Sequence, residues 1–193
     1  MEKTKRYVNL YTESNPNPNS MKFVVNFMLT PEAEAVDYPS MESAQSSPLA
    51  LALFTYPFVE RVFIAANFIT ITKASDEEWV NILSKLKQFI REYLEEGSPV
   101  FDVRLLASQP EMNEQDDELV TRIKGILDEY VRPAVESDGG AISFHSFDSG
   151  RVKVKLQGSC SGCPSSTITL KAGIENLLKR MVPEVTEVVA EGA

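Results

Sequence analysis

The chain has 193 residues, of which 43% are apolar, and it carries a formal net charge of −9. This length suits one large domain or two small ones, and the apolar content supports a buried core. Acidic residues outnumber basic ones in both halves of the chain. Because neither half is basic enough to hold a phosphate backbone, we expect no nucleic-acid partner.

The first ten residues, MEKTKRYVNL, lack the apolar run of a secretory signal and the Arg- and Ser-rich character of a transit peptide. No apolar segment of the sequence is long enough to cross a bilayer. We therefore expect a cytoplasmic protein without a membrane partner. In that reducing compartment, two closely spaced cysteines indicate metal binding or redox chemistry rather than a structural disulfide.

The first half of the chain predicts a small α+β domain over residues 1–97, in the order β-β-α-β-β-α. Period-two patterns and β-forming residues predict strands at 6–13, 21–29, 59–65 and 68–73, the last two joined by a tight turn. Segment 30–46 has no clear period, and we expect it to be a surface excursion.

Two helices are expected in this first domain. Ser47 followed by Pro48 is typical of a helix N-terminus. An amphipathic helix is predicted from Asp76 to Leu94, and its expected inward face consists of Trp79, Val80, Leu83, Leu86, Ile90 and Leu94.

A polar, non-periodic stretch predicts a linker over residues 98–115, followed by a second small α+β domain over 116–193. This domain is expected in the order α-β-β-α-β. Its first helix should run from Asp116 to Val131, with Pro133 near its end. A hairpin should turn at residues 148–150, and a final strand should follow the second helix. That second helix, Pro164 to Met181, should direct Ile168, Ile174, Leu177, Leu178 and Met181 inward.

Cys160 and Cys163 are the only cysteines in the chain, and they lie between a predicted strand and a predicted helix. Gly158 allows a sharp turn before them, and Pro164 starts the helix directly after them. Unpaired N–H groups and the positive end of the helix dipole favour thiolates at this place. We expect both sulfurs to lie unburied at the molecular surface, where a second copy of the chain can reach them.

The number of possible ligands restricts the chemistry of this CxxC pair. A structural zinc site or a four-iron cluster normally takes four ligands. One chain supplies two cysteines and a single histidine, His145. The position of His145 in a hairpin strand indicates an exposed or structural imidazole rather than a ligand. The residues leave three alternatives: a metal site shared by two copies, a thiol redox pair, or an inert pair. The antiparallel hairpin before the motif disfavours a thioredoxin fold.

Two further features bear on function. Ser137–Gly140, the sequence SDGG, is interpreted as a helix-terminating turn, with a role in shaping a cluster pocket or a partner surface as the alternative. No glycine-rich phosphate loop is present, and no nucleophile is placed to use His145 as a base, so we expect no enzyme and no catalytic residue.

The combination of RPAVESDGGAISF with GRVKVKLQGSCSGCPSSTITLKAGIENLLKRMVPEV resembles the NifU C-terminal domain of Nfu-type proteins. SNPNPNSMKFVV and SPLALALFTYPFVERVFIAANFITITK resemble the Nfu N-terminal domain that accompanies it. The resemblance implies a homodimer that binds a [4Fe-4S] cluster through Cys160 and Cys163 of each chain. It also implies an upstream cluster scaffold as donor and apo iron–sulfur proteins as clients. A thiol redox or zinc-binding protein is the alternative. Packing of both Cys160 and Cys163 inside an apolar core would contradict a role in cluster transfer.

Overall fold

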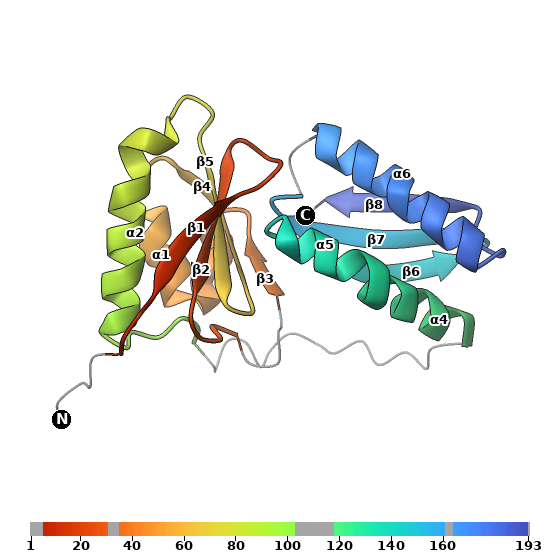
Figure 1. Cartoon of the computed structure of the whole chain (residues 1–193), viewed down its shortest axis with the longest axis horizontal. Coiled ribbons are helices and arrows are strands. Elements are labelled where there is room, and N and C mark those ends of the chain that lie inside the picture. Colours follow the sequence, from red (N-terminus) through yellow and green to blue (C-terminus); the bar gives the residue numbers. More distant parts are fainter. Residues whose placement is uncertain (1–5, 31–34, 103–117, 161–163, 193) are drawn as a thin grey trace. The chain divides into compact units, whose positions relative to one another are not determined.

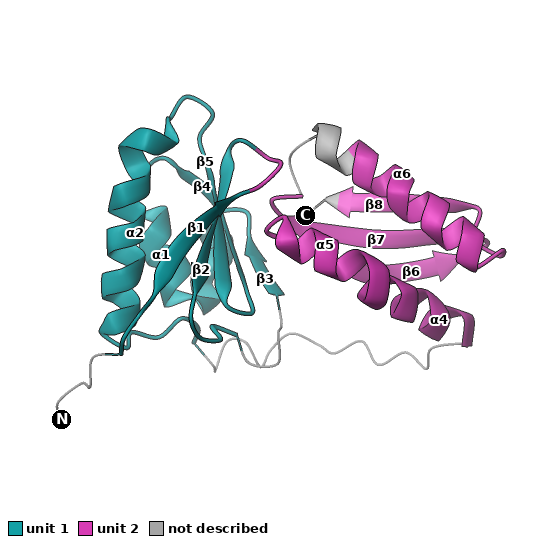
Figure 2. Cartoon of the chain, in the orientation of Figure 1, with its two compact units in different colours: residues 1–14, 18–110 teal, residues 15–17, 111–193 magenta. Residues whose placement is uncertain are grey.

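The computed structural model describes residues 6–30, 35–102, 118–160 and 164–192 (Figure 1). The chain divides into two compact units, residues 1–14 with 18–110 and residues 15–17 with 111–193 (Figure 2). Each unit combines helices with its own sheet, which confirms the α+β class. Most of the predicted linker 98–115 lies outside the described residues, and the exact domain boundaries stay a prediction. None of the helices in the described ranges is long and apolar enough to span a membrane.

Unit 1 is built on a five-stranded sheet in the order β1-β2-β5-β4-β3, in which all neighbours are antiparallel. The strands are β1 (Leu10–Ser14), β2 (Ser20–Val25), β3 (Ala35–Tyr38), β4 (Val59–Ala65) and β5 (Phe68–Lys73). The predicted tight turn between β4 and β5 is confirmed.

The interpretation of segment 30–46 as a surface excursion was wrong. It contains the edge strand β3 and the 3₁₀ helix η2 (Glu42–Ser46). A strand of four residues offers too few alternations to be detected by its period. Its pairing with β4, from Ala35 opposite Ala65 to Tyr38 opposite Val62, is what defines it.

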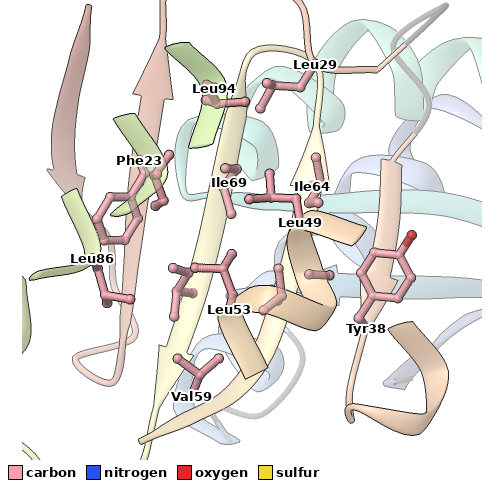
Figure 3. Close-up of a cluster of buried hydrophobic side chains, with 14 of the residues drawn as sticks. Phe23, Leu29, Tyr38, Leu49, Leu53, Val59, Ile64, Ile69, Leu86 and Leu94 are labelled. Atoms are coloured by element: carbon pink, nitrogen blue, oxygen red, sulfur yellow. The ribbon is translucent and has the colours of Figure 1, made fainter. Parts of the chain in front are cut away.

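Helices α1 (Pro48–Phe54) and α2 (Trp79–Glu95) pack against one face of this sheet and enclose an apolar core (Figure 3). The predicted cap of α1 is confirmed, since Ser47 Oγ accepts a hydrogen bond from the Ala50 N–H at 3.1 Å. The inward row of α2 consists of Ile82, Leu86, Ile90 and Leu94.

One residue of the expected α2 face was assigned wrongly. Val80 is 84% exposed. It precedes the buried Ile82 by two residues, and a helix turns by about 100° per residue, so Val80 points away from the core. Trp79 and Leu83 flank the buried row and are partly buried against it.

Unit 2 is built on a three-stranded sheet in the order β6-β7-β8. Strands β6 (Gly140–Asp148) and β7 (Arg151–Gly158) form the predicted antiparallel hairpin, whose turn residues Ser149 and Gly150 have positive φ. Strand β8 (Glu187–Gly192) runs parallel to β7. Helix α6 (Pro164–Met181) makes the crossover that a parallel pair requires.

The first helical segment of unit 2 extends further than predicted. It comprises α4 (Glu118–Ile126), a π-helical turn η3 (Leu127–Val131) and α5 (Arg132–Ser137). The expectation that it ends at Val131 was wrong because Pro133 lies in the first turn of α5, where a missing N–H is tolerated. Helix α5 therefore continues to the SDGG sequence.

The helices of unit 2 cover one face of its sheet, and alternate residues of β7 contribute Val152, Val154 and Leu156 to the core between them. Ile174 and Leu178 of α6 are buried there as expected, with Leu177 and Met181 partly buried beside them. Ile168 is 69% exposed, so its expected inward position was wrong.

Candidate functional site

The two cysteines follow the end of β7. Gly158, the last residue of that strand, has a φ of +68°, the left-handed conformation that glycine adopts without strain. Ser159 and Cys160 come next, and α6 begins at Pro164. Cys163 lies outside the described residues. The predicted strand–turn–helix setting of the motif is thus observed on both sides of it.

The expectation of a surface sulfur was wrong for Cys160. This residue is 5% exposed and belongs to the buried core cluster of unit 2. A cysteine thiol packs like a small apolar side chain, and the space at the end of the hairpin accommodates it. Cys160 is therefore a sheltered thiol in this structure.

The SDGG sequence forms the turn that was predicted, and this turn also contacts the cysteine loop. Helix α5 ends here, where the Gly139 N–H donates to the Glu136 carbonyl. The Ser159 N–H donates to the Gly139 carbonyl at 3.3 Å, and the Ser159 hydroxyl donates to the Asp138 carbonyl. The interpretation of SDGG as a helix-terminating turn is confirmed, and its role in shaping a cluster pocket or a partner surface stays a prediction.

The electrostatic environment at the start of α6 suits negatively charged sulfur. The first turn of this helix carries no acidic residue, whereas Lys179 and Arg180 occupy its last turn. The acid-free first turn leaves the positive end of the helix dipole without a competing carboxylate, and the two basic residues favour the negative end. A thiolate directly before Pro164 would therefore be stabilised.

The two cysteines of one chain supply half of the ligands of a four-thiolate site. Within the described ranges, no group of three or more His, Cys, Asp or Glu side chains is arranged to hold a metal ion. His145 is exposed on β6, at the point where the β6–β7 register shifts. Two soft sulfur ligands per chain match the donor type that iron–sulfur clusters and zinc take.

Two family models match the chain. The model described as "Scaffold protein Nfu/NifU N terminal" matches residues 10–97, and the model described as "NifU-like domain" matches residues 123–189. The second match includes Cys160, Cys163 and the SDGG turn.

Curated relatives match along nearly the whole chain. "NFU1 iron-sulfur cluster scaffold homolog, mitochondrial" of Drosophila willistoni is 41% identical over 184 residues, which are 95% of this chain and 64% of the relative. The protein of the same name from Drosophila sechellia is 41% identical, over 95% of this chain and 65% of the relative. The chain thus spans slightly less than two thirds of these relatives.

A solved structure is also similar. The NifU-like protein from Saccharomyces cerevisiae, determined by solution NMR, is 24% identical with a TM-score of 0.44, over 52% of this chain and 89% of that one.

The names of these relatives correct one expectation. We expected a cytoplasmic protein from the composition of residues 1–10, but the Drosophila relatives are named mitochondrial. The expected cytoplasmic localisation is therefore wrong. Composition at the N-terminus was a poor guide to the compartment.

The two family models occur in the order that the sequence motifs indicated, and together they account for both folded units. The chain belongs to the Nfu-type family, with an Nfu N-terminal domain followed by a NifU-like domain.

Proposed function

We propose that this protein is an iron–sulfur cluster carrier in which two chains share one [4Fe-4S] cluster. Cys160 and Cys163 of each chain would provide its four thiolate ligands. The observation that carries the proposal is the number of ligands: a CxxC pair within a NifU-like domain, and no other cysteine in the chain. Four cysteines are the usual ligand set of such a cluster, and a two-fold axis supplies them from two identical loops.

The relatives' names support the assembly role. Both Drosophila proteins are called iron–sulfur cluster scaffold homologues. We infer that the present chain receives a cluster from an upstream scaffold and delivers it to apo iron–sulfur proteins. A cluster bound by only two ligands per chain can be released when the two chains separate, so the protein would act as a carrier rather than as a catalyst.

The burial of Cys160 adds a requirement to this proposal. Cys160 is 5% exposed in one chain, so its side chain offers little surface to a second chain. Cluster binding therefore requires the Cys160 side chain to leave its buried position, and release of the cluster allows it to return.

The proposal is tested by anaerobic reconstitution of the metal-free chain with ferrous iron and sulfide. We expect about two irons and two sulfides per chain, together with a dimer on size-exclusion chromatography. Cys160→Ser and Cys163→Ser should each abolish this iron binding. His145→Ala, which removes the only histidine, is the matched control and should bind iron as the unmodified chain does.

The outcomes separate the proposal from its alternatives. A chain that stays monomeric and retains no iron would contradict the carrier function. A colourless dimer with about half a zinc per chain would identify a zinc site instead. Turnover in a disulfide-reduction assay without bound metal would identify a thiol oxidoreductase.

A further inference from the structure

Gly140 lies beside the sulfur of Cys160. It is the first residue of β6 and pairs with Gly158, the last residue of β7. A Cβ built on Gly140 would stand 2.9 Å from Cys160 Sγ and 2.7 Å from the Gln157 carbonyl oxygen. Real Cβ atoms essentially never come so close to a neighbour, so any side chain at position 140 would force one of these groups to move.

The Gln157 carbonyl oxygen, the nearer of these two neighbours, does not move easily. The Gln157 oxygen belongs to the backbone of β7, which pairs with β6 on one side and with β8 on the other. Cys160 follows Ser159, whose backbone N–H and hydroxyl both donate to the turn that contains Asp138 and Gly139. The strand end and the cysteine loop are therefore attached to the same turn.

We propose that Gly140 is a positioning residue for Cys160. The missing side chain leaves the space that the Cys160 sulfur occupies, and this space shelters the thiol in the metal-free chain. The inference rests on the proposed function, in which Cys160 is a cluster ligand. It assigns to the second glycine of SDGG a task that turn formation does not require, namely keeping one of the two ligand thiols buried until a cluster is bound.

A thermodynamic cycle on the metal-free chain tests whether the sulfur is what opposes a side chain at position 140. Gly140→Ala is compared with the unmodified chain. The Gly140→Ala, Cys160→Ala double variant is compared with Cys160→Ala alone. Melting is followed by circular dichroism. The fluorescence of Trp79, the only tryptophan, monitors unit 1 separately.

We expect Gly140→Ala to lower the melting temperature of unit 2 by roughly 5–10 °C when Cys160 is present. In the Cys160→Ala background the loss should be smaller by at least about 3 °C, because the contact with the sulfur is gone. Gly173→Ala is the matched control, since a Cβ there meets nothing within 4 Å. It should show the same small effect in both backgrounds.

Thiol reactivity distinguishes a positioning role of Gly140 from a purely structural one. Loss of a purely structural glycine would not raise the reactivity of Cys160 selectively. Residues 156–171 form one tryptic peptide that contains both cysteines, so mass spectrometry can report alkylation of each by iodoacetamide. In Gly140→Ala we expect Cys160 alkylation to be about tenfold faster, with Cys163 as the internal reference.

Equal losses of melting temperature in both backgrounds, or an unchanged Cys160 alkylation rate, would overturn the inference. If Gly140→Ala does not fold, folding of the Gly140→Ala, Cys160→Ala double variant supports it, and failure of that variant to fold overturns it. Because both measurements use metal-free protein, they are independent of the proposed function. The proposed carrier function is contradicted if the unmodified chain binds no iron, regardless of the results for the Gly140 variants.

Discussion

Gly150 connects the hairpin turn of unit 2 to its parallel strand, and Gly150→Ala should destabilise this unit strongly. Its carbonyl oxygen accepts from the Thr186 N–H at 2.7 Å, from Thr186 Oγ1 at 3.1 Å and from the Glu187 N–H at 3.3 Å. Gly150 has a φ of +85°, and a Cβ there would stand 2.7 Å from Thr186 Oγ1 and 3.0 Å from the Glu184 carbonyl oxygen.

The expected magnitude follows from two effects. A left-handed conformation costs a non-glycine residue about 1–2 kcal/mol. Displacement of Thr186 by the new methyl group weakens one or two hydrogen bonds, each with a net value of about 1 kcal/mol. The sum of about 3 kcal/mol should lower the melting temperature of unit 2 by about 15 °C.

Thermal unfolding monitored by circular dichroism measures this loss, while the transition of Trp79 fluorescence in unit 1 should not move. Alanine variants at two other glycines separate the effect of backbone strain from the effect of crowding. Gly97 has a φ of +67° but open space around its Cα, so Gly97→Ala should show the strain alone, in unit 1. Gly173→Ala has neither strain nor crowding and should be neutral or slightly stabilising. A Gly150→Ala variant within about 1 kcal/mol of Gly173→Ala would refute the reasoning.

Two further predictions concern a cap and a carboxylate. Ser47→Ala should destabilise unit 1 by about 1–2 kcal/mol, because Ser47 Oγ caps α1 and also donates to the Val100 carbonyl at 2.6 Å. Trp79 fluorescence during denaturant unfolding measures this loss of stability. An unchanged unfolding midpoint would contradict the prediction. The Lys179 side chain and a backbone N–H of β8 hold the pKa of Glu175 below its ordinary value of 4.5. The stabilising contribution of the Glu175 carboxylate is therefore complete above pH 4.5 and is lost as the pH falls through the lowered pKa. Glu175→Gln should then make the melting temperature of unit 2 depend less on acid pH. Identical pH profiles for the unmodified chain and Glu175→Gln would rule this out.

The elements that the sequence predicted correctly are those whose pattern is local. The Ser47–Pro48 start of α1, the turn between β4 and β5, the turn at Ser149 and Gly150, and the alternation along β7 each depend on a few neighbouring residues. Residue chemistry at these positions restricts the backbone directly.

The elements that were missed lack a clear pattern in the sequence. Strand β3 has only four residues and exists through its pairing with β4. The helix around Pro133 continues because a π-helical turn precedes the proline. Exposed Val80 and Ile168 show that an apolar residue near a helix start need not face the core.

In the candidate site, too, features set by neighbouring residues were predicted and a contact with a distant segment was not. Glycine before the motif and proline after it predicted the strand–turn–helix setting. The burial of Cys160 could not be predicted, because the SDGG turn that contacts it lies about 20 residues earlier in the chain. The doubled glycine was the available signal, since the second glycine is not needed to end a helix.

Native mass spectrometry of the anaerobically reconstituted protein tests the central claim most directly. It gives chain number and metal content of one species in a single measurement. The proposed function predicts a species of two chains with one four-iron, four-sulfide cluster, which is absent from Cys160→Ser and from Cys163→Ser. Iron held by a single chain, or a metal-bound dimer that persists in both serine variants, would contradict a cluster shared through Cys160 and Cys163.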